Sequence, residues 1–249
     1  MPRSARMLID GGTYHVLTRG NNGQTVFHQD ADYQRYLQLL SECAKAHQLK
    51  LYHFALMPNH VHLVLEAAQG GGLSHAMHGL NLTYALFYQR HYQYRGHLWQ
   101  DRFKSLLIDR DSYLLECGRY VELNPVRGGL TKDPRDYAWS SYRVYAEGVD
   151  NPLIAPNPLY ETLGATVQKR QHEYREFIQR GIAQEPSLHL DRYQFIGGTT
   201  ASMKVLEELF GVPRIRRRRG RPRKMTTPGI DGGKNRTVPN FFNREGDEK

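Results

Sequence analysis

The order of the expected strands and helices constrains this chain more than any other feature of its sequence. Strand-like composition marks segments 11–18, 49–56, 60–66 and 97–108. Helical patterning, clearest in the first of them, marks segments 30–47, 73–94 and 109–124. The order β-α-β-β-α-β, followed by a helix, is the split βαβ pattern of ferredoxin-like folds. We therefore expect an α+β protein in which an antiparallel sheet has its helices on one face.

Local signals mark where the expected elements begin and end. Met57-Pro58-Asn59 predicts a tight turn between the two middle strands. Asp30 is the expected N-cap of the first helix, and Gly70-Gly71-Gly72 is expected to break the chain before the second. Pro125 is expected to end the third helix, because its ring removes an N–H and disfavours the α-conformation at the preceding residue.

The chain divides into four parts by composition. Residues 1–147 hold the ferredoxin-like pattern, and residues 148–160, with three prolines, indicate a linker. Residues 161–213 are expected to form a small helical C-terminal region, with helices near 165–180 and 201–210. Residues 214–249 form a basic tail that we expect to be disordered.

The net charge of +9 belongs to one short segment. Residues 1–213 carry 22 basic and 21 acidic side chains, whereas Arg214 to Lys224 carry eight basic side chains and no acidic one. An anionic partner is therefore expected for this segment, while any anion affinity of the remaining chain must come from local arrangement.

Composition also restricts the class and the compartment of the protein. A hydrophobic content of 39% over 249 residues suffices for a sizeable core, which argues against a wholly disordered chain. The longest apolar runs fall far short of the roughly 20 residues that span a bilayer, so no membrane association is expected. The N-terminus has no signal-peptide core, and the only cysteines are Cys43 and Cys117, so a reduced cytoplasmic protein is expected.

Two histidines share one face of an expected strand. His60 and His62 are two residues apart, so the strand period points both imidazoles to the same side. Two such imidazoles can bind one metal ion, although an isolated His-x-His pair is more often structural. The apolar neighbours Val61, Leu63 and Val64 place the pair at or near the buried sheet.

Tyr120 and Asn124 form a second pair, four residues apart on one helix face. A phenol whose proton is removed can attack phosphorus, and an amide oxygen can complete the shell of a hard cation without adding charge. Spacing alone favours the simpler interpretation, a packed tyrosine beside a capping asparagine.

The motifs together resemble a known family. Met57-Pro58-Asn59-His60-Val61-His62-Leu63-Val64 looks like the HUH signature (His, bulky apolar residue, His) of single-tyrosine transposases. The whole pattern resembles the REP-associated tyrosine transposases within that superfamily, with further blocks at 11–16 (Gly-Gly-x-Tyr-His-Val), 19–21 (Arg-Gly-Asn), 98–104 (Leu-Trp-Gln-x-Arg-Phe-Lys), 120–126 and 139–142 (Trp-Ser-Ser-Tyr). The resemblance covers approximately residues 7–147 and is specific.

The resemblance implies a role for each residue of the two pairs. His60 and His62 would bind a divalent metal, Mg²⁺ or Mn²⁺, and Tyr120 would be the nucleophile. Asn124 would be the third ligand, where related insertion-sequence transposases have glutamine, with Glu122 as a reserve. The implied enzyme is a metal-dependent endonuclease and strand transferase for single-stranded DNA, acting on hairpin-forming palindromic repeats through a 5′-phosphotyrosine intermediate.

Two other functions remain open at this stage. A non-catalytic DNA hairpin-binding protein could keep the same fold, and a metal-dependent hydrolase with an activated water would need only the histidines. No Gly-x-x-x-x-Gly-Lys-Ser/Thr loop occurs, so no nucleotide cofactor is expected. Both a monomer and a homodimer are compatible with the family.

Several residues are candidates for DNA contacts. Arg19, Asn21, Arg102 and Lys104 lie in the family's blocks and could grip phosphates or base edges, or they could be solvated surface residues. Arg219-Gly220-Arg221-Pro222-Arg223 resembles an AT-hook core, in which Arg219 and Arg221 would enter a narrow minor groove. A polybasic tail with nonspecific phosphate affinity is the alternative.

Overall fold

The structure is a computed structural model that describes residues 8–108, 110–182 and 195–196. The chain divides into two compact units, Met1–Val212 and Pro213–Lys249. The second unit lies outside the described residues, and with it the expected basic tail, Arg219 and Arg221. The helix expected near 201–210 lies outside them as well.

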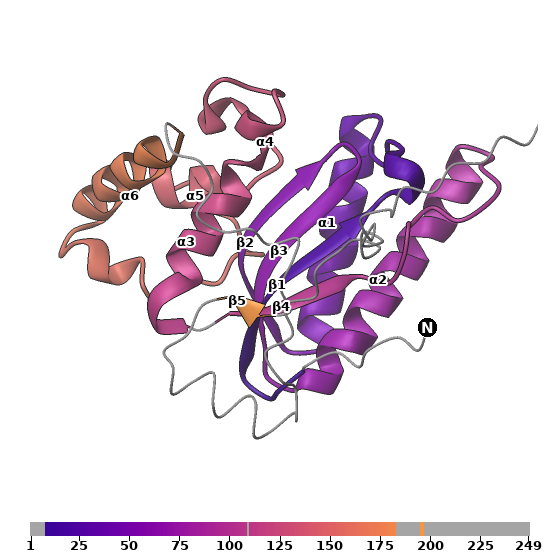
Figure 1. Ribbon diagram of the computed structural model, residues 1–249, viewed down its shortest axis with the longest axis horizontal. Coiled ribbons are helices and arrows are strands. Elements are labelled where there is room, and N and C mark those ends of the chain that lie inside the picture. Colours follow the sequence, from indigo (N-terminus) through magenta and orange to yellow (C-terminus); the bar gives the residue numbers. More distant parts are fainter. Residues whose placement is uncertain (1–7, 109, 183–194, 197–249) are drawn as a thin grey trace, which may run out of the picture. The chain divides into compact units, whose positions relative to one another are not determined.

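The centre of the first unit is a mixed sheet (Figure 1). Its strands are β1 (Gly12–Arg19), β2 (Leu49–Met57), β3 (His60–Ala67), β4 (Lys104–Ile108) and β5 (Phe195–Ile196). They lie in the order β2-β3-β1-β4-β5, antiparallel throughout except between β4 and β5, which are parallel. Helices α1 (Asp30–Ala46) and α2 (Gly70–His91) complete the β-α-β-β-α-β unit, which confirms the ferredoxin-like prediction.

The two faces of the sheet have separate apolar cores. On one face, α1 and α2 pack on side chains from β1 and β3; the buried residues include Tyr14, Val16, Leu63, Leu65, Tyr36, Leu40, Leu80 and Tyr84. On the other face, α3 (Arg110–Glu122) packs through Leu114, Cys117 and Val121 against Ala55 and Val64. The prediction of helices on one face therefore holds for α1 and α2, whereas α3 covers the opposite face (Figure 1).

Two helix starts differ from the sequence-based expectation. The N-cap of α1 is Gln29 and not Asp30, because Asp32 Oδ2 accepts hydrogen bonds from the backbone N–H groups of His28 (2.8 Å) and Gln29 (3.1 Å). Helix α2 begins at Gly70, where the backbone N–H donates to Asp10 Oδ1 at 2.9 Å.

A glycine is needed at the start of α2. A Cβ on Gly70 would lie 2.7 Å from the backbone carbon of Leu8, so the close approach of this N-terminal segment excludes a side chain. Gly70-Gly71-Gly72, which the sequence predicts as a break before the helix, therefore forms the first turn of α2.

The segment around the third helix is more broken than the sequence predicts. Strand β4 covers only the end of the expected segment 97–108, since the preceding residues hold Trp99, whose Nε1 donates to Asn81 O at 2.9 Å. Helix α3 ends at Glu122, two residues before the expected end at Asn124, and a second helix, α4 (Asn124–Arg127), begins after Leu123. The expectation that Pro125 ends the third helix is therefore wrong. Pro125 lies in the first turn of α4, where its missing N–H costs nothing.

The remaining described elements are two α-helices and three short 3-10 helices. They are η1 (Asn21–Gly23), η2 (Pro134–Asp136), α5 (Tyr142–Glu147), η3 (Glu161–Leu163) and α6 (Val167–Ile182). Helix α6 confirms the helix expected near 165–180. Residues 148–160, which the sequence indicates as a linker, attach to β2, since Ala155 N donates to Leu51 O at 2.8 Å. Among the described helices, none has the length and apolar content needed to cross a membrane.

Gly118 fixes how closely α3 lies against β2. A Cβ at this position would come within 2.6 Å of the His53 ring, and His53 is fully buried. No real Cβ tolerates such a contact, so any side chain at 118 forces the helix away from the sheet.

We expect Gly118→Ala to lower the free energy of unfolding by about 1–3 kcal/mol, because the added methyl group overpacks the interface between α3 and β2. The matched control is Gly79→Ala in α2, where a Cβ meets no heavy atom within 4 Å. That variant should gain about 0.5–1 kcal/mol from helix propensity alone. Chemical denaturation of both variants checks the pair, and equal stabilities would contradict the packing described above.

Candidate functional site

His60 and His62 lie on the α3 face of the sheet. Their neighbours Val61 and Leu63 point into the core under α1 and α2, so the two-residue strand period places both histidines on the other side. This confirms the shared orientation expected from the sequence. The rings of His60 and His62 lie 4.8 Å apart between centroids at 81°, and His60 Nδ1 lies 2.6 Å from Asn59 Oδ1.

A third histidine, His15 of β1, completes the cluster. His15 Nε2 lies 2.9 Å from His62 Nδ1, and the two ring planes are only 7° apart. The other two nitrogens, His15 Nδ1 and His62 Nε2, are buried and have no hydrogen-bond partner among the described residues. Buried polar atoms are rarely left unpaired in folded proteins, so the orphaned His62 Nε2 indicates a position for a ligand.

Sequence analysis placed His15 in a family block but gave it no role. The signal was available in principle, because His15 alternates with the core residues Tyr14 and Val16 and therefore belongs to the same face as His62. The two rings meet only because β1 pairs with β3 in one particular antiparallel register, and this register cannot be predicted from the sequence of either strand alone.

Burial keeps His15 and His62 neutral. It lowers the pKa of His15 to about 3. The pKa of His62 lies well below its usual range, mainly because the ring is buried and also because His15 and His60 lie beside it. A neutral imidazole keeps one lone pair, which is the form that binds a metal ion.

Tyr120 of α3 meets this histidine cluster edge-on. Its ring centroid lies 6.0 Å from that of His62 and 6.0 Å from that of His15, with ring planes at 83° and 80°. The structure therefore brings together the tyrosine and the histidines that the sequence singled out in two distant segments.

Arg127 of α4 is the second neighbour of Tyr120 that sequence analysis missed. Its guanidinium carbon lies 5.5 Å from the centroid of the Tyr120 ring. Burial lowers the pKa of Arg127, and the phenol of Tyr120 opposes that shift through its charge when ionised. The Arg127 guanidinium therefore lies beside the Tyr120 ring as a cation–π neighbour.

Asn124 lies beside Tyr120 at the start of α4. Its Nδ2 donates to Tyr120 O at 2.8 Å and, more weakly, to Val121 O at 3.3 Å. With the amide nitrogen bonded to the backbone, Oδ1 is the atom of this side chain that remains to bind a cation. Spacing alone had favoured a capping asparagine, and the contacts with the end of α3 fit that interpretation as well.

Glu122 does not belong to this cluster, so its reserve role as a ligand is wrong. It is fully buried, and its carboxylate accepts hydrogen bonds from Ser141 Oγ (2.6 Å) and Tyr174 Oη (2.7 Å). His53 Nδ1 lies 2.9 Å from the same carboxylate, and Asn157 Nδ2 donates to His53 Nε2 at 2.8 Å. Every partner of Glu122 is thus a protein group that ties α3 to β2, α5 and α6.

The candidates for DNA contacts fall into two pairs. Arg19 pairs with His60 in the β1–β3 register, and Lys104 pairs with Leu17, the partner of His62. Strand alternation therefore places both exposed side chains on the face of the histidine cluster. Asn21 is half-buried in η1 and Arg102 is exposed in the segment before β4, and the described contacts link neither side chain to the histidines.

The chemistry of the donor set restricts what this site can hold. Among the described residues, no three His, Cys, Asp or Glu side chains are placed to hold a metal ion together. A metal here would need an amide as well as the two imidazoles, which is the set of His60, His62 and Asn124. Such a mixed nitrogen and oxygen set suits a divalent ion that also keeps positions for substrate oxygens.

Comparison with known proteins gives this geometry its context. The family model of IS200-like transposases matches residues 9–124. Residues 9–124 belong to the IS200-like transposase family. This transposase domain contains the histidine cluster, Tyr120 and Asn124, and its family indicates a transposase-type function on DNA.

One solved structure supports the fold of this domain, and a second shows a weaker similarity. A REP-associated tyrosine transposase bound to a REP hairpin superposes with a TM-score of 0.51, at 20% identity, over 62% of this chain and 92% of that one. A protein of Deinococcus radiodurans assigned as a transposase is 18% identical over 49% of this chain and 96% of that one, with a TM-score of 0.35. No curated protein matches this sequence.

Proposed function

We propose that this chain is a REP-associated tyrosine transposase. It would act as a metal-dependent endonuclease and strand transferase on single-stranded DNA that folds into palindromic hairpins. The observation that carries the proposal is the position of Tyr120, whose ring lies 6.0 Å from that of His62 on a face that also holds Arg19 and Lys104. A nucleophile, candidate metal ligands and cations for phosphate on one face are the parts that phosphoryl transfer needs.

The residues present fit a divalent metal ion. His62 offers a buried Nε2 with no other partner among the described residues, His60 lies on the same side of β3, and Asn124 offers Oδ1. We propose these three as the ligands of Mg²⁺ or Mn²⁺. When bound, the ion supplies Lewis-acid polarisation of the phosphate oxygens.

His15 acts through His62 as a positioning residue in this proposal. If His62 Nε2 provides the lone pair for the metal, His62 Nδ1 carries the proton and donates it to His15 Nε2. That hydrogen bond selects the tautomer and holds the ring plane. Outer partners of this kind commonly matter almost as much as the ligands themselves.

Tyr120 performs the covalent step. Its phenolic oxygen attacks the scissile phosphorus and loses its proton to solvent, and the new O–P bond replaces the bond to the 3′ oxygen, which leaves as a hydroxyl after taking up a proton. Arg127, beside the Tyr120 ring, stabilises the negative charge that develops during the attack. The 5′-phosphotyrosine keeps the energy of the phosphodiester, so the 3′-hydroxyl can reverse the step without a nucleotide cofactor.

The DNA partner would lie along the exposed edge of this face. Arg19 and Lys104 would bind phosphates near the histidines, and Asn21 and Arg102 would contact the strand beside them. Arg219 and Arg221 of the tail would add contacts to an adjacent A·T-rich groove. The REP hairpin bound by the structural relative supports the choice of hairpin DNA as substrate. The chain could act as a monomer or as a homodimer.

We expect Tyr120→Phe to abolish a covalent protein–DNA adduct, because the variant lacks only the attacking oxygen. The experiment incubates the full chain with hairpin-bearing single-stranded DNA and Mn²⁺ and counts adducts that survive denaturation. The matched control is Tyr113→Phe on the same helix, which should form the adduct at the wild-type level.

Other outcomes of this experiment point to the other functions. An adduct that persists in Tyr120→Phe would exclude Tyr120 as the nucleophile. Strand cleavage without an adduct in the wild-type chain would indicate a hydrolase, and tight binding without cleavage would indicate a hairpin-binding protein.

We expect His15→Leu to weaken Mn²⁺ binding about 10- to 100-fold, because it removes the acceptor that orients His62. His15→Gln keeps an acceptor oxygen and should recover part of the affinity. The control His78→Leu replaces an exposed histidine of α2 and should bind as the wild type does. Calorimetric titration of the DNA-free chain measures all three, and wild-type affinity in His15→Leu would refute the positioning role.

A further inference from the structure

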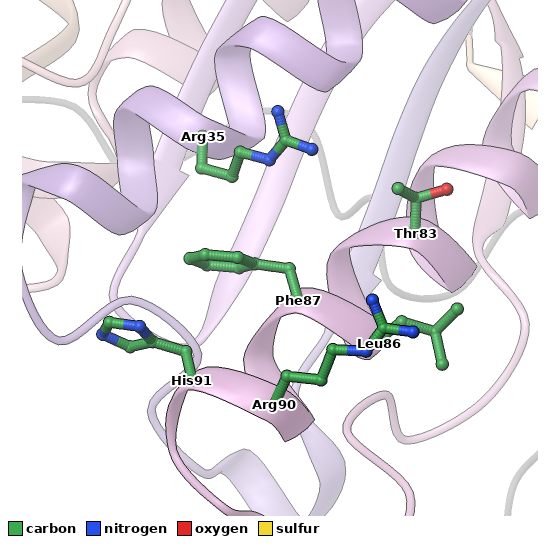
Figure 2. Close-up of a pocket in the computed structure, with 6 residues that line it drawn as sticks. All are labelled: Arg35, Thr83, Leu86, Phe87, Arg90 and His91. Atoms are coloured by element: carbon green, nitrogen blue, oxygen red, sulfur yellow. The ribbon is translucent and has the colours of Figure 1, made fainter.

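A hollow between α1 and α2 lies on the side of the sheet away from α3. It has a volume of about 420 Å³ and is lined by Arg35 of α1 and by Thr83, Leu86, Phe87, Arg90 and His91 of α2 (Figure 2). Because α1 and α2 cover one face and α3 the other, this hollow is separate from the histidine cluster. None of the roles proposed above uses it.

The hollow presents positive charge without compensation. Two of its six lining residues are arginines, one is a histidine, and none is acidic. Arg35 donates to the neutral amide oxygen of Gln38 at 2.9 Å, and within the described part of the chain neither Arg35 nor Arg90 forms an ion pair. The two arginines therefore give the hollow a positive charge, which favours an anionic ligand.

The centre of the hollow is aromatic. Phe87 lies between Arg35 on one side and Arg90 and His91 on the other (Figure 2). The rings of Phe87 and His91 are stacked, with centroids 5.5 Å apart and planes at 17°, so His91 lies against one face of Phe87 and the opposite face is on the side of Arg35 (Figure 2). Leu86 beside them is 42% exposed, which extends the apolar patch to solvent.

We propose that this hollow binds a stretch of single-stranded DNA outside the cleavage site. A base would stack on Phe87, and the phosphates on either side would contact Arg35 and Arg90. Aromatic faces combined with a basic groove are how proteins hold single strands without reading their sequence. An acidic protein segment would match the charge but would not need the stacked rings. The inference rests on the proposed function only in taking DNA as the ligand.

The test measures binding to an oligothymidylate, which forms no hairpin, by fluorescence anisotropy over a range of salt concentrations. The double variant Arg35→Gln/Arg90→Gln should bind about tenfold more weakly and show a salt slope shallower by about 1.4, because two phosphate contacts are lost. Phe87→Leu should also weaken binding about tenfold, with the slope unchanged, because it removes stacking and no charge. Lys45→Gln, which removes an exposed charge from the far end of α1, should leave both quantities as in the wild type.

Two further readouts separate this inference from its alternatives. At saturating hairpin DNA the variants should form the Tyr120 adduct at the wild-type rate, since the hollow lies on the other face. Unchanged oligothymidylate binding in both variants would overturn the inference. A change of sedimentation coefficient in the DNA-free variants would overturn it too, by assigning the hollow to contact between copies. If the wild type forms no adduct but the variants still bind oligothymidylate more weakly than it does, the hollow binds single-stranded DNA and the proposed transposase chemistry is refuted.

Discussion

The close contact between Gly118 of α3 and His53 of β2 determines where the candidate nucleophile lies. A side chain at 118 would reach within 2.6 Å of the His53 ring, so the helix can approach the sheet only because glycine stands there. The buried carboxylate of Glu122, four residues further along the helix, lies 2.9 Å from Nδ1 of the same histidine. Tyr120 lies between these two contacts, which fix the depth and rotation of its helix segment above the histidines.

The same buried network connects the transposase domain with the chain that follows it. Ser141, Asn157 and Tyr174 come from three segments beyond residue 124, yet all three donate to Glu122 or His53. A network of this kind is costly to leave half-satisfied, because removing one partner strands a buried polar group. Residues 139–182 therefore contribute to the site indirectly, by holding the helix that carries Tyr120.

Prediction from sequence succeeded where local periodicity decides the structure. The strand period placed His60 and His62 on one face, and the order of elements predicted the ferredoxin-like sheet. It failed where contacts join distant segments. The His15–His62 pair depends on strand register, and Arg127 reaches Tyr120 only because α4 directly follows α3. Glu122 is a residue type that can bind metal, but it lies in the core. The Glu122 carboxylate is bonded to residues that no spacing rule connects to position 122.

In the proposed site, α3 holds Tyr120 over a metal ion bound by His60 and His62. Anomalous diffraction from a crystal of the full chain soaked with Mn²⁺ would locate this ion. We expect a manganese peak bound by His60, His62 and Asn124, with the Tyr120 hydroxyl facing the ion and His15 hydrogen-bonded to His62. A peak bound by other residues, or a Tyr120 hydroxyl that points away from the ion, would refute the proposed site.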